Sequence, residues 1–375
     1  MRKIEIAEIE NSYLNFFTPA IIVAAGYFLF NLIAWPLLFV GQFVLSLNIL
    51  DTQFLAYLGL SLQILSLILV CLFFYFIVIP RLKIQDKDID HKTISYANLI
   101  IVFLLLCAAK FCQTVFAVEK GLRVFGYSAF GLISITKELI NPVTIVLMLL
   151  LTAFATPFYY EIIYRRTLIP LLEDRGLSSF HSVLVANLGF VFVELPTIIV
   201  SASYSDSIEI LTIHLIYGFF AGLIYIMTRN VLFPMIFGFF LKSFEVLRFL
   251  GEILAIDALL WGYELFTLST FIIGLIVLTY AIIEPESNEK LLKLIKKRSA
   301  PHIKRGIIGF MLISLGLLGL QTVTAIIFRS LTDNFIIYLF FKTIFYAFVF
   351  SIPFFLTIKT EYAQSQEIAP IISEE

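Results

Sequence analysis

The sequence predicts an all-α protein, a polytopic transmembrane helical bundle with about eight to ten spans. Hydrophobic residues make up 60% of the chain and charged residues only 14%, whereas charged residues make up about 25% of a soluble globular domain. The apolar residues also gather into runs close to the roughly 20 residues that a helix needs to cross a bilayer. The runs cover residues 15–40, 54–79, 95–117, 139–160, 180–200, 208–228, 230–250, 264–283, 305–328 and 333–357.

The first predicted region, residues 1–138, holds three of these runs and carries no motif. Its start mixes Arg2 and Lys3 with three glutamates, before an apolar run that is too long for the core of a signal peptide. We therefore expect this segment to be a membrane anchor and not a cleaved leader.

Residues 139–250 are the predicted functional core, because charged side chains lie within or beside their apolar runs. These charges are Glu161, Glu194 and Lys242. A charge near the bilayer centre costs about 3 kcal/mol on insertion scales, so it normally faces a protected interior and has a partner. Function should therefore be sought around these three side chains.

The last region, residues 251–359, is predicted to add three spans and a basic cytoplasmic loop at residues 284–305. Within this loop, residues 290–298 alternate basic and apolar side chains at helical spacing. This pattern favours an interfacial helix attracted to anionic lipid. Residues 360–375 are polar and are predicted to be disordered.

The loops between the runs predict the orientation of the chain in the membrane. Most of the 26 Lys and Arg residues lie on one side if the N-terminus is cytoplasmic, as the positive-inside rule requires. Both termini of this multi-pass membrane protein are therefore predicted to be cytoplasmic. The formal net charge of −1 gives no reason to expect nucleic acid as a partner, and the lipid bilayer is the expected surrounding.

Two segments of the core carry carboxylates. In residues 156–173, Glu161 and Arg165 are four apart and share a helix face, so they can pair. In residues 189–196, Glu194 falls inside an otherwise apolar run. A buried lone carboxylate must be either protonated or paired, so Glu194 is not a casual surface residue.

A third segment, residues 218–245, joins a glycine-containing run to a second run through a short turn at Arg229 and Asn230. The second run bears Lys242 and Glu245. These two residues are three apart, so they can satisfy each other on one helix face.

The order and spacing of the three segments resemble the CPBP family of intramembrane metalloproteases. This family includes the Ras-converting type of CAAX prenyl endopeptidase and bacterial bacteriocin self-immunity proteins. Its motifs are EExxxR, then FxxxH, often followed by Leu-Pro, then HxxxN. The resemblance covers roughly residues 139–250.

The first two motifs are partly retained. In the first, Glu161 is the second glutamate and Arg165 is the arginine, while Tyr160 stands at the first glutamate position. In the second, Phe190 matches, but Glu194 stands at the histidine position. The resemblance therefore implies catalytic-type positions at Glu161, Arg165 and Glu194.

In the third motif, Gly238 stands at the histidine position and Lys242 at the asparagine position. The resemblance places both in the cleft, together with Tyr160 and Phe190. In the family, a carboxylate and the histidines hold a divalent metal that activates water. Because both histidines are replaced, we expect no cofactor, and we expect Lys242 to occupy the place of the metal and neutralise Glu194, Glu161 or both.

Three functions remain open on these residues. The first is an inactive homologue that binds a hydrophobic or lipidated partner, such as a prenylated peptide or a membrane protein. The second is a working endopeptidase whose zinc site is rearranged around Glu161, Glu194 and His214, with Glu161 or Glu194 as general base. The third is a proton-coupled transporter that uses Glu161, Glu194 and Lys242 as a relay.

Overall fold

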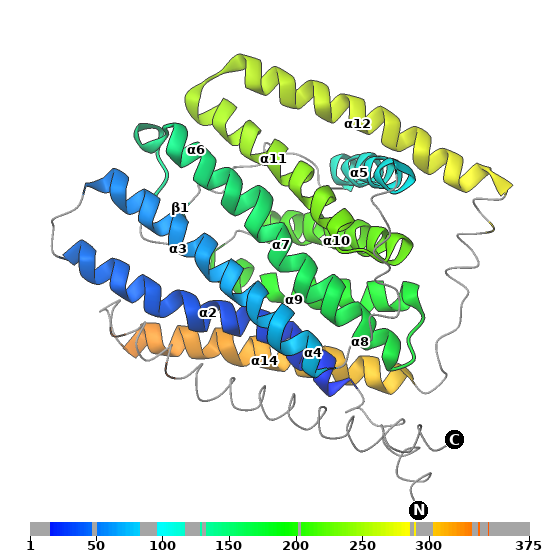
Figure 1. Cartoon of the computed structure of the whole chain (residues 1–375), viewed down its shortest axis with the longest axis horizontal. Coiled ribbons are helices and arrows are strands. Elements are labelled where there is room, and N and C mark those ends of the chain that lie inside the picture. The colour runs from blue at the N-terminus through cyan, green and yellow to red at the C-terminus, as the bar shows by residue number, and fades with distance from the viewer. Residues whose placement is uncertain are drawn as a thin grey trace, which may run out of the picture.

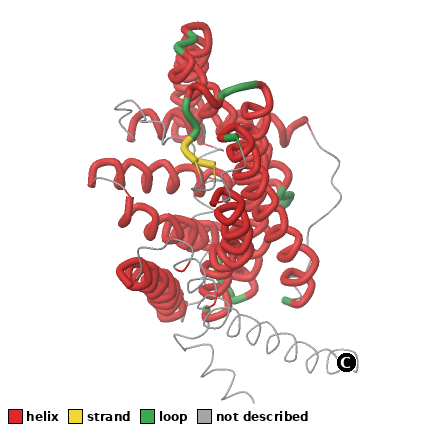
Figure 2. The backbone as a smooth tube through the Cα atoms, turned by 90° about the vertical axis from the view of Figure 1, so that its left-hand side faces the viewer, coloured by secondary structure: helices red, strands yellow, loops and turns green. Residues whose placement is uncertain are grey.

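The structure is a computed structural model, and it confirms the predicted all-α polytopic class. It describes residues 16–46, 51–82, 96–116, 128–129, 133–201, 204–285 and 303–331, together with isolated positions beyond them. The described chain is helical throughout, apart from turns and one antiparallel pair of two-residue strands (Figure 2). These strands are β1 (Ser128–Ala129) and β2 (Ile133–Ser134).

The N-terminal region forms three helical rods. They are α2 (Phe17–Ser46), then α3 (Thr52–Phe73) continued by the π-helix η1 (Phe74–Val78) and by α4 (Ile79–Arg81), and α5 (Tyr96–Phe116). Each coincides with one predicted run.

The core begins with the 3-10 turn η2 (Lys137–Leu139) and then one unbroken rod that alternates between α- and π-helix. The parts of the rod are α6 (Pro142–Leu149), η3 (Leu150–Ala155), α7 (Thr156–Tyr160), η4 (Glu161–Leu168) and α8 (Ile169–Asp174). It is followed by α9 (Ser179–Ser201), α10 (Tyr204–Thr228) and α11 (Leu232–Leu254). The C-terminal region adds α12 (Asp257–Ile283) and α14 (Ile303–Leu331).

Six helices of the described chain are long and apolar enough to cross a membrane. They are Phe17–Ala34, Thr52–Arg81, Tyr96–Phe116, Pro142–Asp174, Leu211–Thr228 and Asp257–Ile283. The helix α11 is long enough but carries four charged residues. The predicted span 333–357, the tail 360–375 and most of the basic loop lie outside the described residues. The placement of both termini in the cytoplasm stays a prediction.

Each π-helical segment stops just before a proline. The segments η1, η3 and η4 are followed at the second position by Pro80, Pro157 and Pro170. Proline has no N–H, and its ring clashes with the carbonyl four residues earlier. Widening the preceding turns to i→i+5 bonds relieves that clash without breaking the rod.

Threonine hydroxyls support the two wide segments of the core rod. Thr156 Oγ1 donates to the Leu151 carbonyl at 2.8 Å, and Thr167 Oγ1 donates to the Ile162 carbonyl at 2.8 Å. Both bonds reach back five residues, so the side chains follow the π spacing. The hydroxyls thereby satisfy their own hydrogen-bonding capacity within the rod, at carbonyls five residues earlier in each wide segment.

The bundle places the core rod, α10 and α11 between two outer groups of helices (Figure 1). On one side α14 packs beside α2 and α9, and on the other α5 packs along α12. The helices α9 and α10 also pack extensively on each other. Side chains at the middle of the core rod are therefore covered from both sides.

Candidate functional site

A fully buried ion pair forms the centre of the core. Glu161 and Arg165 lie on η4, and Arg165 Nε is 3.2 Å from Glu161 Oε2, with side-chain exposures of 2% and 0%. The pairing predicted from their four-residue spacing is confirmed. The two opposite charges make the site neutral, which limits the free-energy cost of burying it.

The helix α10 supplies a hydrogen bond to each partner of this ion pair. Tyr217 Oη donates to Glu161 Oε1 at 3.0 Å, and Arg165 Nη2 donates to the Gly218 carbonyl at 3.0 Å. Both bonds are buried. Glu161 and Arg165 therefore tie η4 to one point on α10.

Aromatic rings enclose the pair. The Arg165 guanidinium lies 5.1 Å from the ring centroid of Phe190 and 5.7 Å from that of Tyr217. Tyr160, at the first glutamate position of the resemblance, packs edge-on against Phe190 at a centroid distance of 4.8 Å. Phe237 covers the other side of Tyr217 at 5.6 Å. Cation–π contacts of this kind gain strength when they are desolvated.

Two polar atoms of the ion pair lack a hydrogen bond within the described chain, Glu161 Oε2 and Arg165 Nη1. Oε2 is nevertheless held by the charge of Arg165, whose Nε is 3.2 Å away. The carboxylate is thus engaged at both oxygens, one by a hydroxyl and one by a guanidinium.

The Tyr217 hydroxyl fills the space beside Gly238. A Cβ built on Gly238 would lie 2.6 Å from Tyr217 Oη and 2.8 Å from Pro157 Cβ, and real Cβ atoms essentially never make contacts that short. Gly238 stands where the resemblance expects a histidine. The place of that imidazole is therefore taken by a phenol that already donates to Glu161.

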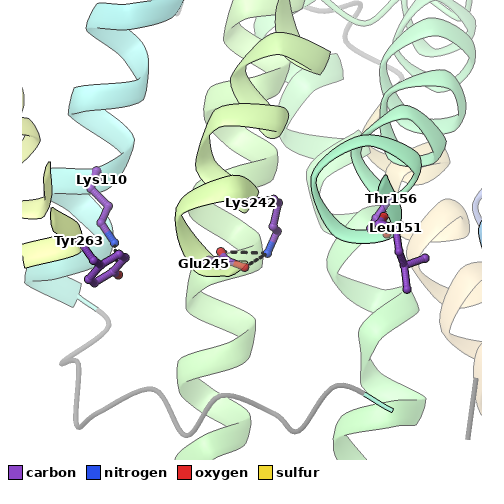
Figure 3. A network of polar contacts seen from close by, with 6 residues as sticks. All are labelled: Lys110, Leu151, Thr156, Lys242, Glu245 and Tyr263. Carbon is purple, nitrogen blue, oxygen red and sulfur yellow. Dashed lines mark hydrogen bonds and ion pairs between the residues drawn. The ribbon is translucent and has the colours of Figure 1, made fainter. Parts of the chain in front are cut away.

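Lys242 does not reach Glu161. Its Nζ donates to Glu245 Oε1 at 3.0 Å and to Glu245 Oε2 at 2.7 Å (Figure 3). The predicted neutralisation of Glu161 by Lys242 is wrong, because Arg165 does this from the same helix at four-residue spacing. The side chain of Glu194 lies outside the described residues, so its pairing with Lys242 stays a prediction.

His214 lies on α10, one turn before Tyr217. Its ring centroid is 5.6 Å from that of Phe190, so it belongs to the rim of the aromatic enclosure. Among the described residues, no group of three or more His, Cys, Asp or Glu side chains is placed to hold a metal ion.

A comparison with protein families finds a match in this part of the chain. Residues 142–244 match the family model of type II CAAX prenyl endopeptidases, Rce1-like. This segment is similar to that family. It nearly coincides with the region of the predicted resemblance, residues 139–250, and contains all the residues of the Glu161 site. The searches of curated proteins and of solved structures each returned no match.

Among the side chains that the structure describes, residues 142–244 do not offer the donors that a catalytic metal needs. Zinc requires several nitrogen, sulfur or oxygen ligands, with one position left for water. Gly238 has no side chain, and Lys242 is a cation held by Glu245. Glu161 is already bound to Arg165 and Tyr217. The described residues therefore do not fit a divalent metal at the motif positions.

Sequence reasoning missed Tyr217, the residue that completes the site. It lies 56 positions from Glu161, so no local spacing links the two. The available signal was weaker: a tyrosine in the middle of an apolar span needs a partner for its hydroxyl.

Proposed function

We propose that this integral membrane protein is a catalytically inactive homologue of the CAAX-type proteases that binds a hydrophobic or lipidated partner. The observation that carries the proposal is that Arg165 and Tyr217 occupy both carboxylate oxygens of Glu161. A general base must reach the proton that it removes, directly or through one water. Both oxygens of Glu161 are instead engaged inside a dry aromatic enclosure.

The replacement of the motif histidines supports the same function. Gly238 cannot bind metal, and restoring a histidine there would drive its side chain into the Tyr217 hydroxyl and Pro157. The inactive site is thus built as a packed unit, which is compatible with a protein that retains the scaffold for binding.

Metal analysis and a cleavage assay test the loss of catalysis. The full chain is purified in detergent with zinc present, washed, and analysed for bound metal, and it is then incubated with a farnesylated CAAX peptide. We expect neither stoichiometric metal nor cleavage above the level of a Glu161→Gln variant. Zinc at one equivalent that is lost in Glu194→Gln or His214→Ala, together with cleavage, would establish the rearranged endopeptidase instead.

A photoreactive probe tests the binding of a lipidated partner. A farnesyl-cysteine peptide carrying a photocrosslinker is compared with the same peptide without the lipid, in nanodiscs containing the full chain. We expect saturable labelling within residues 142–244 only for the lipidated probe. Equal labelling by both probes would contradict lipid recognition, and pH-driven solute flux in liposomes that requires Lys242 would favour a transporter.

A further inference from the structure

One face of α11 is charged over half of its length. Lys242, Glu245, Arg248 and Glu252 follow one another at spacings of three or four residues, so they form a single stripe. At 1.5 Å per residue, Lys242 is about 15 Å from the start of the helix and about 18 Å from its end. The stripe therefore runs from the middle of the bundle to the end at which α11 turns into α12.

The four charged side chains of the stripe form two ion pairs with one another, but they remain partly exposed. Lys242 binds Glu245, and Arg248 Nε donates to Glu252 Oε1 at 2.8 Å. The side chains are 19%, 31%, 11% and 38% exposed from Lys242 to Glu252. Glu161 and Arg165 are buried, whereas these four side chains are partly exposed. The most exposed of them, Glu252, is nearest the end of the helix.

Lipid is a poor surrounding for this stripe, and α11 has another face for lipid. Phe240 is 48% exposed. At about 100° per residue, it lies about 160° around the helix from Lys242 and about 140° from Glu245. The apolar exposure and the charged exposure thus point in different directions. Ionised groups at membrane depth that do not face protein normally line water.

The end of the stripe nearest α12 contacts buried polar groups of the neighbouring helices. The Arg248 guanidinium lies 5.1 Å from the ring centroid of Tyr263 on α12, and Lys110 Nζ on α5 donates to Tyr263 Oη at 2.9 Å. Figure 3 shows the Lys110–Tyr263 contact and the Lys242–Glu245 pair in one view. Lys110 and Tyr263 are 6% and 3% exposed, so this contact forms a buried wall that Arg248 joins to α11.

We propose that the charged stripe of α11 lines a water-filled crevice that descends from the membrane surface at the α11–α12 turn to Lys242 at mid-depth. The crevice admits small hydrophilic solutes. It begins one turn from Gly238, which borders the Glu161 site, but it does not depend on whether that site is catalytic.

Thiol accessibility tests the crevice. The free cysteines Cys71, Cys107 and Cys112 are first replaced by alanine. Two variants then place a single cysteine in the stripe while removing the partner's charge, Glu245→Cys with Lys242→Gln and Lys242→Cys with Glu245→Gln. The full chain in liposomes is treated with membrane-impermeant charged methanethiosulfonates. The matched control is Phe240→Cys, which is exposed at similar depth on the apolar face.

We expect the stripe cysteines to react at least about tenfold faster than the Phe240→Cys control, because apolar surroundings suppress the reactive thiolate. Each variant must elute as the same monodisperse peak as the parent. Having two stripe variants keeps the test decisive if one fails to fold. Stripe cysteines that react no faster than Phe240→Cys would overturn the crevice and place the stripe against lipid or another protein.

Discussion

Glu161 shows how one carboxylate is retained in the middle of an apolar bundle. Its charge is balanced by Arg165 at 3.2 Å, and its other oxygen accepts from Tyr217. Removing one partner from a buried pair is far more costly than removing both, because the remaining charge is left uncompensated. The side chains around Glu161 should therefore be strongly coupled in mutational experiments.

Removal of the Tyr217 hydroxyl should destabilise the protein. In Tyr217→Phe the carboxylate of Glu161 loses its donor in a site that water does not reach, at a cost of about 1–3 kcal/mol. The free energy of unfolding is measured from SDS titrations in mixed micelles. Tyr280→Phe is the control, because Tyr280 is 60% exposed, and it should change stability by less than about 0.5 kcal/mol.

A methyl group at position 238 should also be costly. In Gly238→Ala, overpacking against Tyr217 and Pro157 costs about 1–3 kcal/mol, more than the roughly 1 kcal/mol that alanine gains over glycine in a helix. Gly262→Ala is the matched control, because a Cβ there meets nothing within 4 Å, and it should stabilise.

The same substitution in the Tyr217→Phe background isolates the contact with the hydroxyl. If Tyr217 Oη is what the new methyl meets, the two changes are non-additive by about 1 kcal/mol, and Gly238→Ala is milder without the hydroxyl. Additive losses in the same SDS titrations would show that Pro157 alone limits the space.

At this scale the sequence predicts what is local. The pairing of Glu161 with Arg165 follows from their spacing, because both lie on one helix. Tyr217 could not be found in this way, since it comes from another helix. The expected contact between Lys242 and Glu161 failed for the same reason, because Lys242 has a nearer partner in Glu245 on its own helix.

The core rod is shaped by its prolines. Two π segments precede Pro157 and Pro170, and η4 carries both Glu161 and Arg165. A run of wide turns is rare in helices and is frequent at functional sites. Here the two π-helical segments let one rod contain two prolines without a break.

Loss of the Thr167 hydroxyl tests the support of η4. Thr167→Val removes the buried bond to the Ile162 carbonyl with little change in volume, and should destabilise by about 1 kcal/mol. Thr212→Val is the control, because its bond to Ile208 reaches back four residues at an exposed position. Equal losses in thermal unfolding of the two variants would indicate that the π segment needs no such support.

Composition and length predicted where helices lie, but not where the core rod ends. The predicted run of 139–160 stops at the first charge, whereas the helix continues to Asp174. The charges that ended the prediction are neutralised within the bundle, so they do not end the helix. A hydropathy value is assigned to each residue separately, so it does not include the effect of a partner that neutralises the charge.

At the scale of the whole molecule, three groups of polar contacts in the described part of the chain lie at different levels of the bundle. The dry Glu161 site lies near the middle, the charged stripe runs toward the α11–α12 turn, and a third group lies at the α10–α11 turn. There Arg229 donates to Glu173 at 2.7 and 2.9 Å and to Ser179 at 3.0 Å. This clamp joins the ends of α8, α9 and α10.

Arg229 holds the clamp from a backbone conformation that favours glycine, with φ of 52°. Arg229→Gln should therefore lose the bidentate pair, at about 1 kcal/mol for a partly exposed ion pair, while keeping the strain. Adding Glu173→Gln to that variant should cost little more, because the partner is already gone.

Arg229→Gly separates the ion pair from the strain. It loses the same contacts as Arg229→Gln but adopts positive φ without penalty, so it should be about 0.5–1 kcal/mol more stable than the glutamine variant. Both free energies of unfolding are measured side by side in the same micelles. A glycine variant that is less stable than the glutamine variant would mean that the turn is unstrained and that the clamp alone fixes how these helix ends meet.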